Sequence, residues 1–210
     1  ALRRSWRRWP NSRSVAGSIA RREPSSCAGS RDPAGGTRVP VGPPRDPVDG
    51  ARPEATIVTV RAVYLHAPFC ARRCFYCDFA VQVRRHGDAD EWIEALRAEF
   101  EFRRAEGVEL ADRLDSVYVG GGTPSLLGPA AMDRVRDLLG PNRFGAEEFE
   151  WTAEANPESL TPEVAAGWRA AGLGRLSLGV QSFQAAPLRW MGRLHGAEGA
   201  VRAVDTARAA

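Results

Sequence analysis

The stretch YLHAPFCARRCFYCDF, residues 64–79, holds the strongest pattern in the chain. It places Cys70, Cys74 and Cys77 in the spacing C-x3-C-x2-C. These cysteines lie in a loop directly after residues 57–65, whose Val, Ile and Tyr content predicts a β-strand. Thiolates are the usual ligands of iron–sulfur clusters. We therefore interpret the three cysteines as ligands of a [4Fe–4S] cluster that keeps one iron open to an outside molecule.

Two other interpretations of the three cysteines stay open at this point. One is a zinc site completed by His66 or His86, and the other is three free thiols. Structural zinc sites usually show two separated pairs of Cys or His, and the sequence holds no second pair. His66 precedes Pro68 and is interpreted as a residue that orients the cysteine loop rather than as a metal ligand. The lone Cys27 is interpreted as incidental.

Outward from the cysteine loop, helix and strand patterns alternate. Trp92, Leu96 and Phe100 recur every four residues, as on one face of a helix. Thr161 and Pro162 are typical of a helix start. The expected elements are helices over 90–104, 129–139 and 162–172, strands over 57–65, 116–119, 149–155 and 173–180, and further helix toward residue 210.

This alternation implies a parallel sheet with right-handed crossovers. Four such units are about half of a (β/α) barrel. We therefore predict an α/β fold, a partial (β/α) TIM-type barrel over residues 56–210, truncated before its second half. Residues 1–55 are rich in Arg, Pro, Gly and Ser, which predicts a disordered leader. Two interpretations of this leader stay open, an unstructured or spurious upstream region and an organelle transit peptide.

Composition narrows the function classes. Residues 1–55 hold 11 Arg against 5 Asp or Glu, whereas residues 56–210 hold 18 Arg against 21 Asp or Glu. The predicted core therefore lacks the positive charge that a nucleic-acid surface needs. Three of the 4 Cys are clustered, which favours a reducing compartment, taken to be the cytoplasm, over a disulfide scaffold. No apolar run is long enough to predict a transmembrane segment.

The residues around the cysteines, 64–70 and 74–79, resemble the signature of the radical S-adenosylmethionine (SAM) superfamily. More narrowly, they resemble the branch of the oxygen-independent coproporphyrinogen III oxidases (HemN) and the heme chaperones (HemW), from Tyr64 to His195. The resemblance implies that Cys70, Cys74 and Cys77 hold the cluster and that SAM chelates its open iron. It also implies that one electron from the reduced cluster cleaves SAM into methionine and a 5′-deoxyadenosyl radical.

The resemblance also assigns residues to SAM. Tyr64 matches a tyrosine near SAM, and Tyr76 matches an aromatic residue that packs on the adenine. Gly121, Gly122 and Thr123 match the site of the SAM amino group. A glycine run independently permits a close approach of backbone to ligand.

Three later residues match further SAM contacts in the family: Glu154, Gln181 and Arg193. A carboxylate such as Glu154 suits ribose hydroxyls or a cation, and Arg suits bidentate binding of a carboxylate. The cysteine loop, the glycine run, Glu154 and Gln181 all follow expected strands. Ligand sites of barrels lie at the carboxyl ends of their strands, so these residues are expected to form one site.

Within this branch, oxidase members carry a further cysteine two positions after the third motif cysteine. Here that position is Phe79, preceded by Asp78, as in the chaperone-like members. The resemblance thus favours a heme chaperone that binds a [4Fe–4S] cluster, SAM and heme, with heme-acceptor proteins and a reductant as partners. The alternative is a coproporphyrinogen III oxidase, so enzymatic activity stays an open question.

Overall fold

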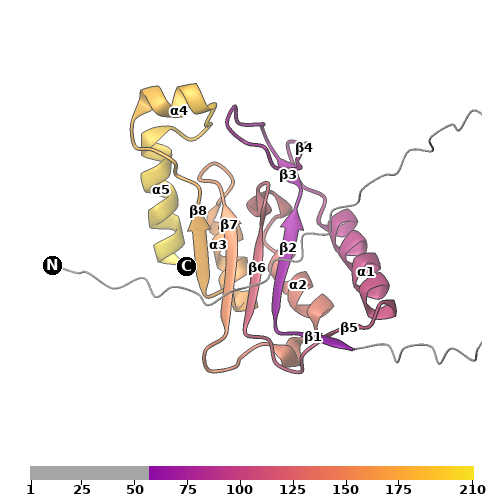
Figure 1. The fold of residues 1–210 in the computed structure, drawn as a ribbon. Helices are drawn as coiled ribbons and strands as arrows, with labels where there is room; N and C mark the ends of the chain where they lie inside the picture. The colour runs from indigo at the N-terminus through magenta and orange to yellow at the C-terminus, as the bar shows by residue number, and fades with distance from the viewer. Residues whose placement is uncertain (1–56) are drawn as a thin grey trace, which may run out of the picture. The chain divides into compact units, whose positions relative to one another are not determined.

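The computed structural model describes residues 57–210 and places four parallel strands in one sheet (Figure 1). Neighbouring strands are all parallel, in the spatial order β2 (Ala62–Ala67), β6 (Ser116–Gly121), β7 (Glu150–Ala155) and β8 (Arg175–Leu178). The predicted α/β fold with a parallel sheet is confirmed. The predictions for residues 1–55, including Cys27, lie outside the described residues.

Helices connect these strands and begin and end where capping residues allow. The Asp88 side chain accepts from the backbone N–H of Glu91, and the Thr161 side chain accepts from that of Val164, so both helices have a capped start. Gly172, in the left-handed conformation, ends the helix that begins at Pro162. The helices are α1 (Ala89–Ala105), α2 (Ala131–Leu139), α3 (Pro162–Ala171), α4 (Ala185–Met191) and α5 (Gly196–Ala209).

The main hydrophobic core lies between the sheet and the helices that cover it. Successive strand residues point to opposite faces of a sheet. Alternate residues of β6 and β7 are therefore buried in one cluster with side chains of α2 and α3. These strand residues are Val117, Val119, Trp151 and Ala153, each 2% exposed or less.

The prediction of a single strand over residues 57–65 is wrong. The chain instead forms β1 (Val58–Val60), which pairs with β5 (Val108–Leu110), and then β2, which joins the main sheet. The break falls at Arg61, whose guanidinium binds the Asp115 carboxylate at 2.5 and 2.8 Å. The backbone N–H of Asp115 also donates to the Arg61 carbonyl. These long-range contacts divide an apolar run that looks continuous in the sequence.

Other element bounds shift by a few residues. The strand expected over 173–180 is shorter because the N–H of Leu173 donates to Trp168 and so belongs to the end of α3. The helix expected from residue 129 begins at Ala131. Short elements not predicted are β3 (Phe69–Cys70), β4 (Gln82–Val83) and the 3-10 helices η1 (Pro124–Leu127) and η2 (Pro141–Arg143).

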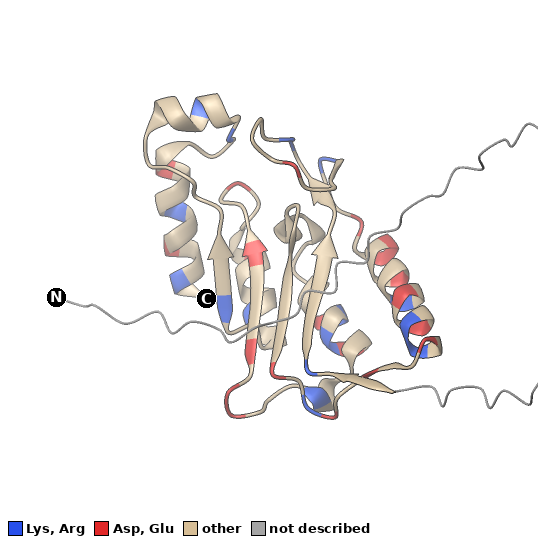
Figure 2. Ribbon diagram, viewed as in Figure 1, with Lys and Arg blue, Asp and Glu red and all other residues tan. Residues whose placement is uncertain are grey.

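Charges of both signs are interspersed along α1 and α5 (Figure 2). The exposed ion pairs of α1 include Arg103 with Glu99 and Glu106. Within residues 57–210, each helix is too short or too polar to span a lipid bilayer.

Candidate cluster and cofactor site

The cysteine loop is closed at its base by a short pair of strands. β3 pairs in parallel with β4, so that Cys70 lies opposite Val83 and the N–H of Arg84 donates to the Cys70 carbonyl at 2.9 Å. Cys70 is buried, whereas Cys74 and Cys77 are half-buried, and all three are free thiols. The N–H of Cys77 donates to the carbonyl of Cys74, which folds the loop between them into a turn. The loop thus leaves the sheet after the carboxyl end of β2 and is held at its base by these hydrogen bonds.

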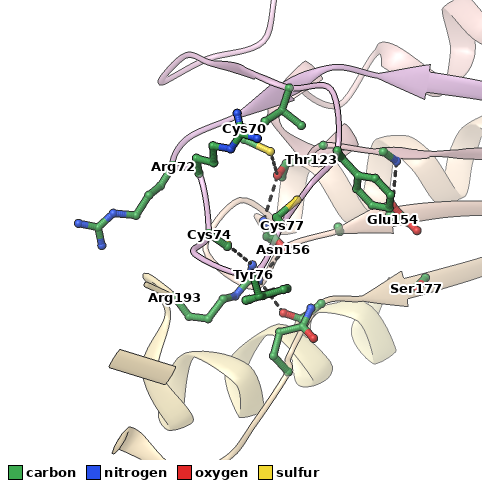
Figure 3. A pocket seen from close by; sticks show the side chains of 18 residues that line it. Cys70, Arg72, Cys74, Tyr76, Cys77, Thr123, Glu154, Asn156, Ser177 and Arg193 are labelled. Atoms are coloured by element: carbon green, nitrogen blue, oxygen red, sulfur yellow. Dashed lines mark hydrogen bonds between the residues drawn. The ribbon is translucent and has the colours of Figure 1, made fainter. Parts of the chain in front are cut away.

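A cavity of about 220 Å³ lies between this loop and the carboxyl ends of the other strands (Figure 3). The predicted site residues converge on it from separate parts of the sequence, with Tyr64 as the exception. Residues that sequence reasoning did not assign to the site also line it, among them Asn156, Ser177 and Gly179. The predicted residues in its wall are Cys70, Cys74, Tyr76, Cys77, Gly121, Gly122, Thr123, Glu154, Gln181 and Arg193.

Two positions in the glycine run need glycine for reasons of packing. Gly121 has φ 110°, and a Cβ there would lie 2.5 Å from the His66 ring. A Cβ on Gly122 would lie 2.6 Å from the Phe69 carbonyl oxygen. The N–H of Gly122 donates to the Ala67 carbonyl at 2.7 Å. The run therefore brings β6 against the base of the cysteine loop, in addition to leaving backbone open at the cavity wall.

The Glu154 carboxylate is held on the cavity side of β7 by two donors. The Tyr118 hydroxyl donates to one oxygen at 2.6 Å, and the N–H of Gly121 donates to the other at 3.0 Å. Burial and this carboxylate raise the pKa of Tyr118 to about 12. Because a carboxylate has about four lone-pair sites, Glu154 keeps acceptor capacity for a ligand.

Tyr64 lies in the middle of β2 and does not line the cavity. Its ring stacks on Tyr118 at 5.9 Å between centroids, and its hydroxyl lies 3.1 Å from His66 Nδ1. Burial and the nearby Glu154 charge raise the pKa of Tyr64. Tyr64 therefore supports the Tyr118–Glu154 pair from one strand away, and its assignment to SAM stays a prediction.

Two histidines fix loops around the cavity. His66 Nε2 lies 3.0 Å from the Ala80 carbonyl, just past the third cysteine, which is a loop-orienting contact of the kind predicted. His195, for which the sequence offered no role, has a buried ring. Its nitrogens lie 3.3 Å from a Glu158 carboxylate oxygen and 3.2 Å from the Val180 carbonyl. It thus joins the segment after α4 to the loops that follow β7 and β8.

Gln181 adopts φ 65°, in the left-handed region that favours glycine. Among residues 57–210 it is the one non-glycine residue with positive φ. Such conformations cost free energy and are concentrated at ligand sites. Its place in the cavity wall, directly after β8, agrees with that tendency.

Arg193 reaches the cavity from the end of α4. Its Nη2 donates to Asn156 Oδ1 and to the Gly179 carbonyl, each at 2.6 Å, and Nη1 lies 3.6 Å from Cys74 Sγ. Its Nε is buried and finds no hydrogen-bond partner among the described residues. A buried donor of this kind fits an anionic group that belongs in the cavity.

The structure also bears on the zinc interpretation of the three cysteines. Among residues 57–210, no three Cys, His, Asp or Glu side chains converge closely enough to hold one metal ion. The zinc interpretation gains no support from this arrangement, since His86 is exposed and the His66 ring faces Tyr64 and Ala80. Three free thiols in the wall of one cavity fit the cysteine ligands that a [4Fe–4S] cluster takes.

The local electrostatics act on Cys70 in both directions. Burial raises the pKa of the Cys70 thiol, while the Thr123 hydroxyl hydrogen bond and the charge of Arg193 lower it. Metal ligation requires the thiolate form. The Thr123 hydroxyl and the Arg193 charge would therefore favour the thiolate form of Cys70, against the effect of burial.

Sequence comparison agrees with this architecture. Residues 64–210 match the profile of the radical SAM superfamily, and the chain belongs to that superfamily. Members of this family in general carry a [4Fe–4S] cluster and use SAM.

Curated relatives of the chain include proteins named heme chaperone HemW. The chain is 44% identical over 136 residues to the heme chaperone HemW of Mycobacterium tuberculosis, covering 63% of this chain and 34% of that protein. It is 34% identical over 149 residues to HemW of Escherichia coli, covering 70% and 38%. Mitochondrial radical SAM domain-containing protein 1 of Mus musculus is 37% identical over 151 residues, covering 71% and 34%. The chain spans about one third of the length of these curated relatives.

A solved structure shows the same fold. Coproporphyrinogen III oxidase (HemN) from Escherichia coli, described as a radical SAM enzyme, matches with a TM-score of 0.60 and 29% sequence identity. The match covers 76% of this chain and 36% of that one. The sequence-based prediction of the HemN/HemW branch is thereby confirmed.

Proposed function

We propose that this chain belongs to a heme chaperone of the HemW type, which binds a [4Fe–4S] cluster and SAM and delivers heme to acceptor proteins. The observation that carries the proposal is the convergence of three free cysteines, the glycine run and Arg193 on one cavity. The similarity to proteins named heme chaperone HemW supports the choice within the superfamily. A reductant for the cluster and a cytoplasmic location are parts of the same proposal.

In this proposal Cys70, Cys74 and Cys77 hold the cluster, and SAM occupies the rest of the cavity. When bound, the cluster supplies one electron for reductive cleavage of the SAM sulfonium. Tyr76 would pack on the adenine, consistent with its place in the cavity wall. The remaining proposed SAM contacts are Tyr64, Gly121, Gly122, Thr123, Glu154, Gln181 and Arg193.

SAM carries both an ammonium and a carboxylate group. The cavity wall holds a side chain of opposite charge for each of them. Glu154 offers a carboxylate whose orientation is fixed by Tyr118 and by the Gly121 N–H. Arg193 offers a guanidinium fixed by Asn156 and Gly179, with its Nε free for an anion. Because these charges are held by other side chains, little reorganisation is needed when the ligand binds.

The second candidate function is that of an oxygen-independent coproporphyrinogen III oxidase. The structural similarity to HemN from Escherichia coli favours it. Against it stands Phe79, which occupies the position of the additional oxidase cysteine. Phe79 lies in the cavity wall and is 59% exposed. Because its side chain is a phenyl ring, this position offers no thiol to the cavity.

Anaerobic reconstitution of the protein expressed from its complete gene tests both candidates. Iron and acid-labile sulfide are measured first, followed by titration with hemin and an assay for coproporphyrinogen decarboxylation. The chaperone proposal expects about four irons and four sulfides per chain, saturable heme binding and no decarboxylation. Decarboxylation would establish the oxidase instead, and protein without sulfide would contradict both candidates. Cys74→Ala is the matched control, because it removes one proposed ligand from a half-buried position.

A further inference from the structure

Asn156 lies at the carboxyl end of β7 with its side chain between two other site residues (Figure 3). Its Nδ2 donates to Thr123 Oγ1 at 3.0 Å, and its Oδ1 accepts from Arg193 Nη2 at 2.6 Å. Its backbone N–H donates to the Ser125 hydroxyl at 3.2 Å. The amide therefore joins the loop after β6 to the segment after α4, with its own backbone fixed.

The chemistry of the partners settles which way the amide points. Arginine has only donors, so Arg193 must face the oxygen of Asn156. The nitrogen of Asn156 must then face Thr123 and donate to its hydroxyl oxygen. Because that interaction uses Thr123 as an acceptor, the hydroxyl proton is left for Cys70 Sγ, which lies 3.5 Å away. Thr123 is 2% exposed, so water does not compete for this proton.

The other end of the amide controls a second donor. Arg193 Nη2 is shared between Asn156 Oδ1 and the Gly179 carbonyl. This anchoring leaves Nη1 at 3.6 Å from Cys74 Sγ. One asparagine thus orients donors toward two of the three cysteine sulfurs, although it contacts neither sulfur itself.

We propose that Asn156 is a positioning residue that helps to set the reduction potential of the cluster, by directing the Thr123 hydroxyl at Cys70 and the Arg193 guanidinium at Cys74. The inference rests on the proposed cluster ligation. Hydrogen bonds to ligand sulfurs stabilise the more negative, reduced form of a cluster and so raise its potential. Loss of a donor should shift the potential to more negative values.

Asn156→Asp tests this inference with almost no change in shape. The variant keeps an acceptor for Arg193 but loses the donor to Thr123, so the Thr123 hydroxyl turns to the new carboxylate and away from Cys70. Thr123→Val removes the same sulfur hydrogen bond directly. Redox titration of the reconstituted protein, with and without SAM, should show a more negative potential for each single variant.

A double-variant cycle separates this mechanism from a simple charge effect. If Asn156 acts through the hydroxyl, Asn156→Asp should shift the potential by less than half as much in a Thr123→Val background as in the unsubstituted protein. In a Thr123→Ser background, where the hydroxyl is retained, Asn156→Asp should shift the potential as much as it does in the unsubstituted protein. Asn142→Asp, which adds the same charge at an exposed position in η2, should leave the potential unchanged.

The outcomes that overturn the inference are distinct from those that overturn the proposed function. Equal shifts by Asn156→Asp in the three backgrounds, or no shift in any of them, would show that Asn156 does not direct the hydroxyl. Absence of iron and sulfide from the unsubstituted protein would instead remove the proposed cluster, and this inference with it. Should Asn156→Asp fail to retain iron, Asn156→Ala must still lower the potential of the cluster or the inference fails.

Discussion

The two faces of the sheet are made by the same strands but serve different purposes. On the helix-covered face, Val117, Val119 and Trp151 are almost fully buried in the apolar core. On the opposite face, Tyr118 and Glu154 are only partly buried and bind each other. Because side chains alternate in direction along a strand, neighbouring residues of one strand contribute either to the core or to the site. Substitutions on the two faces should therefore be distinguishable by experiment.

The largest effect is expected at the cysteine loop, which belongs to the site and contributes little to the core. Cys74→Ala should abolish cluster assembly, because a cluster with two cysteine ligands is not held. The unfolding free energy of the cluster-free protein should stay within about 0.5 kcal/mol of the unsubstituted value, as for other partly exposed positions. Iron and sulfide analysis after anaerobic reconstitution measures the first effect, and urea denaturation measures the second.

Cys27→Ala is the control for this variant and should retain full iron and sulfide. Equal iron content in the two variants would show that Cys74 is not a ligand.

On the helix-covered face, Trp151→Ala should lower the stability of the protein and leave cluster binding unchanged. Trp151 is 2% exposed and packs on Phe144 at 4.8 Å between ring centroids. Its removal should cost about 3–5 kcal/mol of unfolding free energy, from lost burial and from the cavity that is left. Iron bound per folded molecule should not change. Urea denaturation and iron analysis of the folded fraction test this, and a loss of iron with unchanged stability would contradict the division between the faces.

The sequence was sufficient for the order of the β/α units because each unit is a local pattern. Helix starts at Thr161 and strand residues such as Val117 and Val119 follow from capping and burial alone. The division of the first strand at Arg61 was not predictable in this way. It depends on pairing with β5 and on Asp115, 54 residues further along the chain.

The same distinction applies to the site. The cysteines were recognisable because their spacing is a motif, and Glu154 because it is an acid at a strand end. Asn156 was missed, since its role depends on Arg193, 37 residues later, and on Thr123, 33 residues earlier. One signal was available, because Asn156 directly follows β7 and so lies at the edge where barrel sites form. Tyr64 lies six residues before Cys70, and strand geometry alone would place it below that edge.

A smaller effect is expected from Tyr118→Phe, on the cavity face of β6. The hydroxyl donates to the Glu154 carboxylate at 2.6 Å, so its loss should cost about 1–2 kcal/mol of unfolding free energy, reduced from the buried value by solvent screening. SAM affinity should fall as well, because Glu154 loses a group that orients it. Denaturation at pH 8 and SAM titration measure the two effects. Unchanged values for both would show that this hydrogen bond does not support the site.

The pH dependence of stability gives Tyr118 a separate signature. Its pKa is raised from 10.0 to about 12 in the folded protein, by burial and by Glu154. Below pH 10 both states hold the proton and the stabilisation is complete. Between pH 10 and 12 the unfolded chain loses its proton first, so unfolding free energy falls as pH rises. Urea denaturation of the cluster-free protein at pH 8, 10 and 11 should show a smaller decline for Tyr118→Phe than for the unsubstituted protein.

The smallest effect is expected at Gln181, where the cavity wall departs from good backbone geometry. Its φ of 65° costs a residue with a Cβ about 1 kcal/mol relative to glycine. Gln181→Gly should therefore be more stable than Gln181→Ala by about that amount, while both variants lose the proposed SAM contact equally. Urea denaturation and SAM titration of the two variants separate backbone strain from side-chain function. If Gln181→Ala were as stable as Gln181→Gly, the backbone at residue 181 would hold no strain.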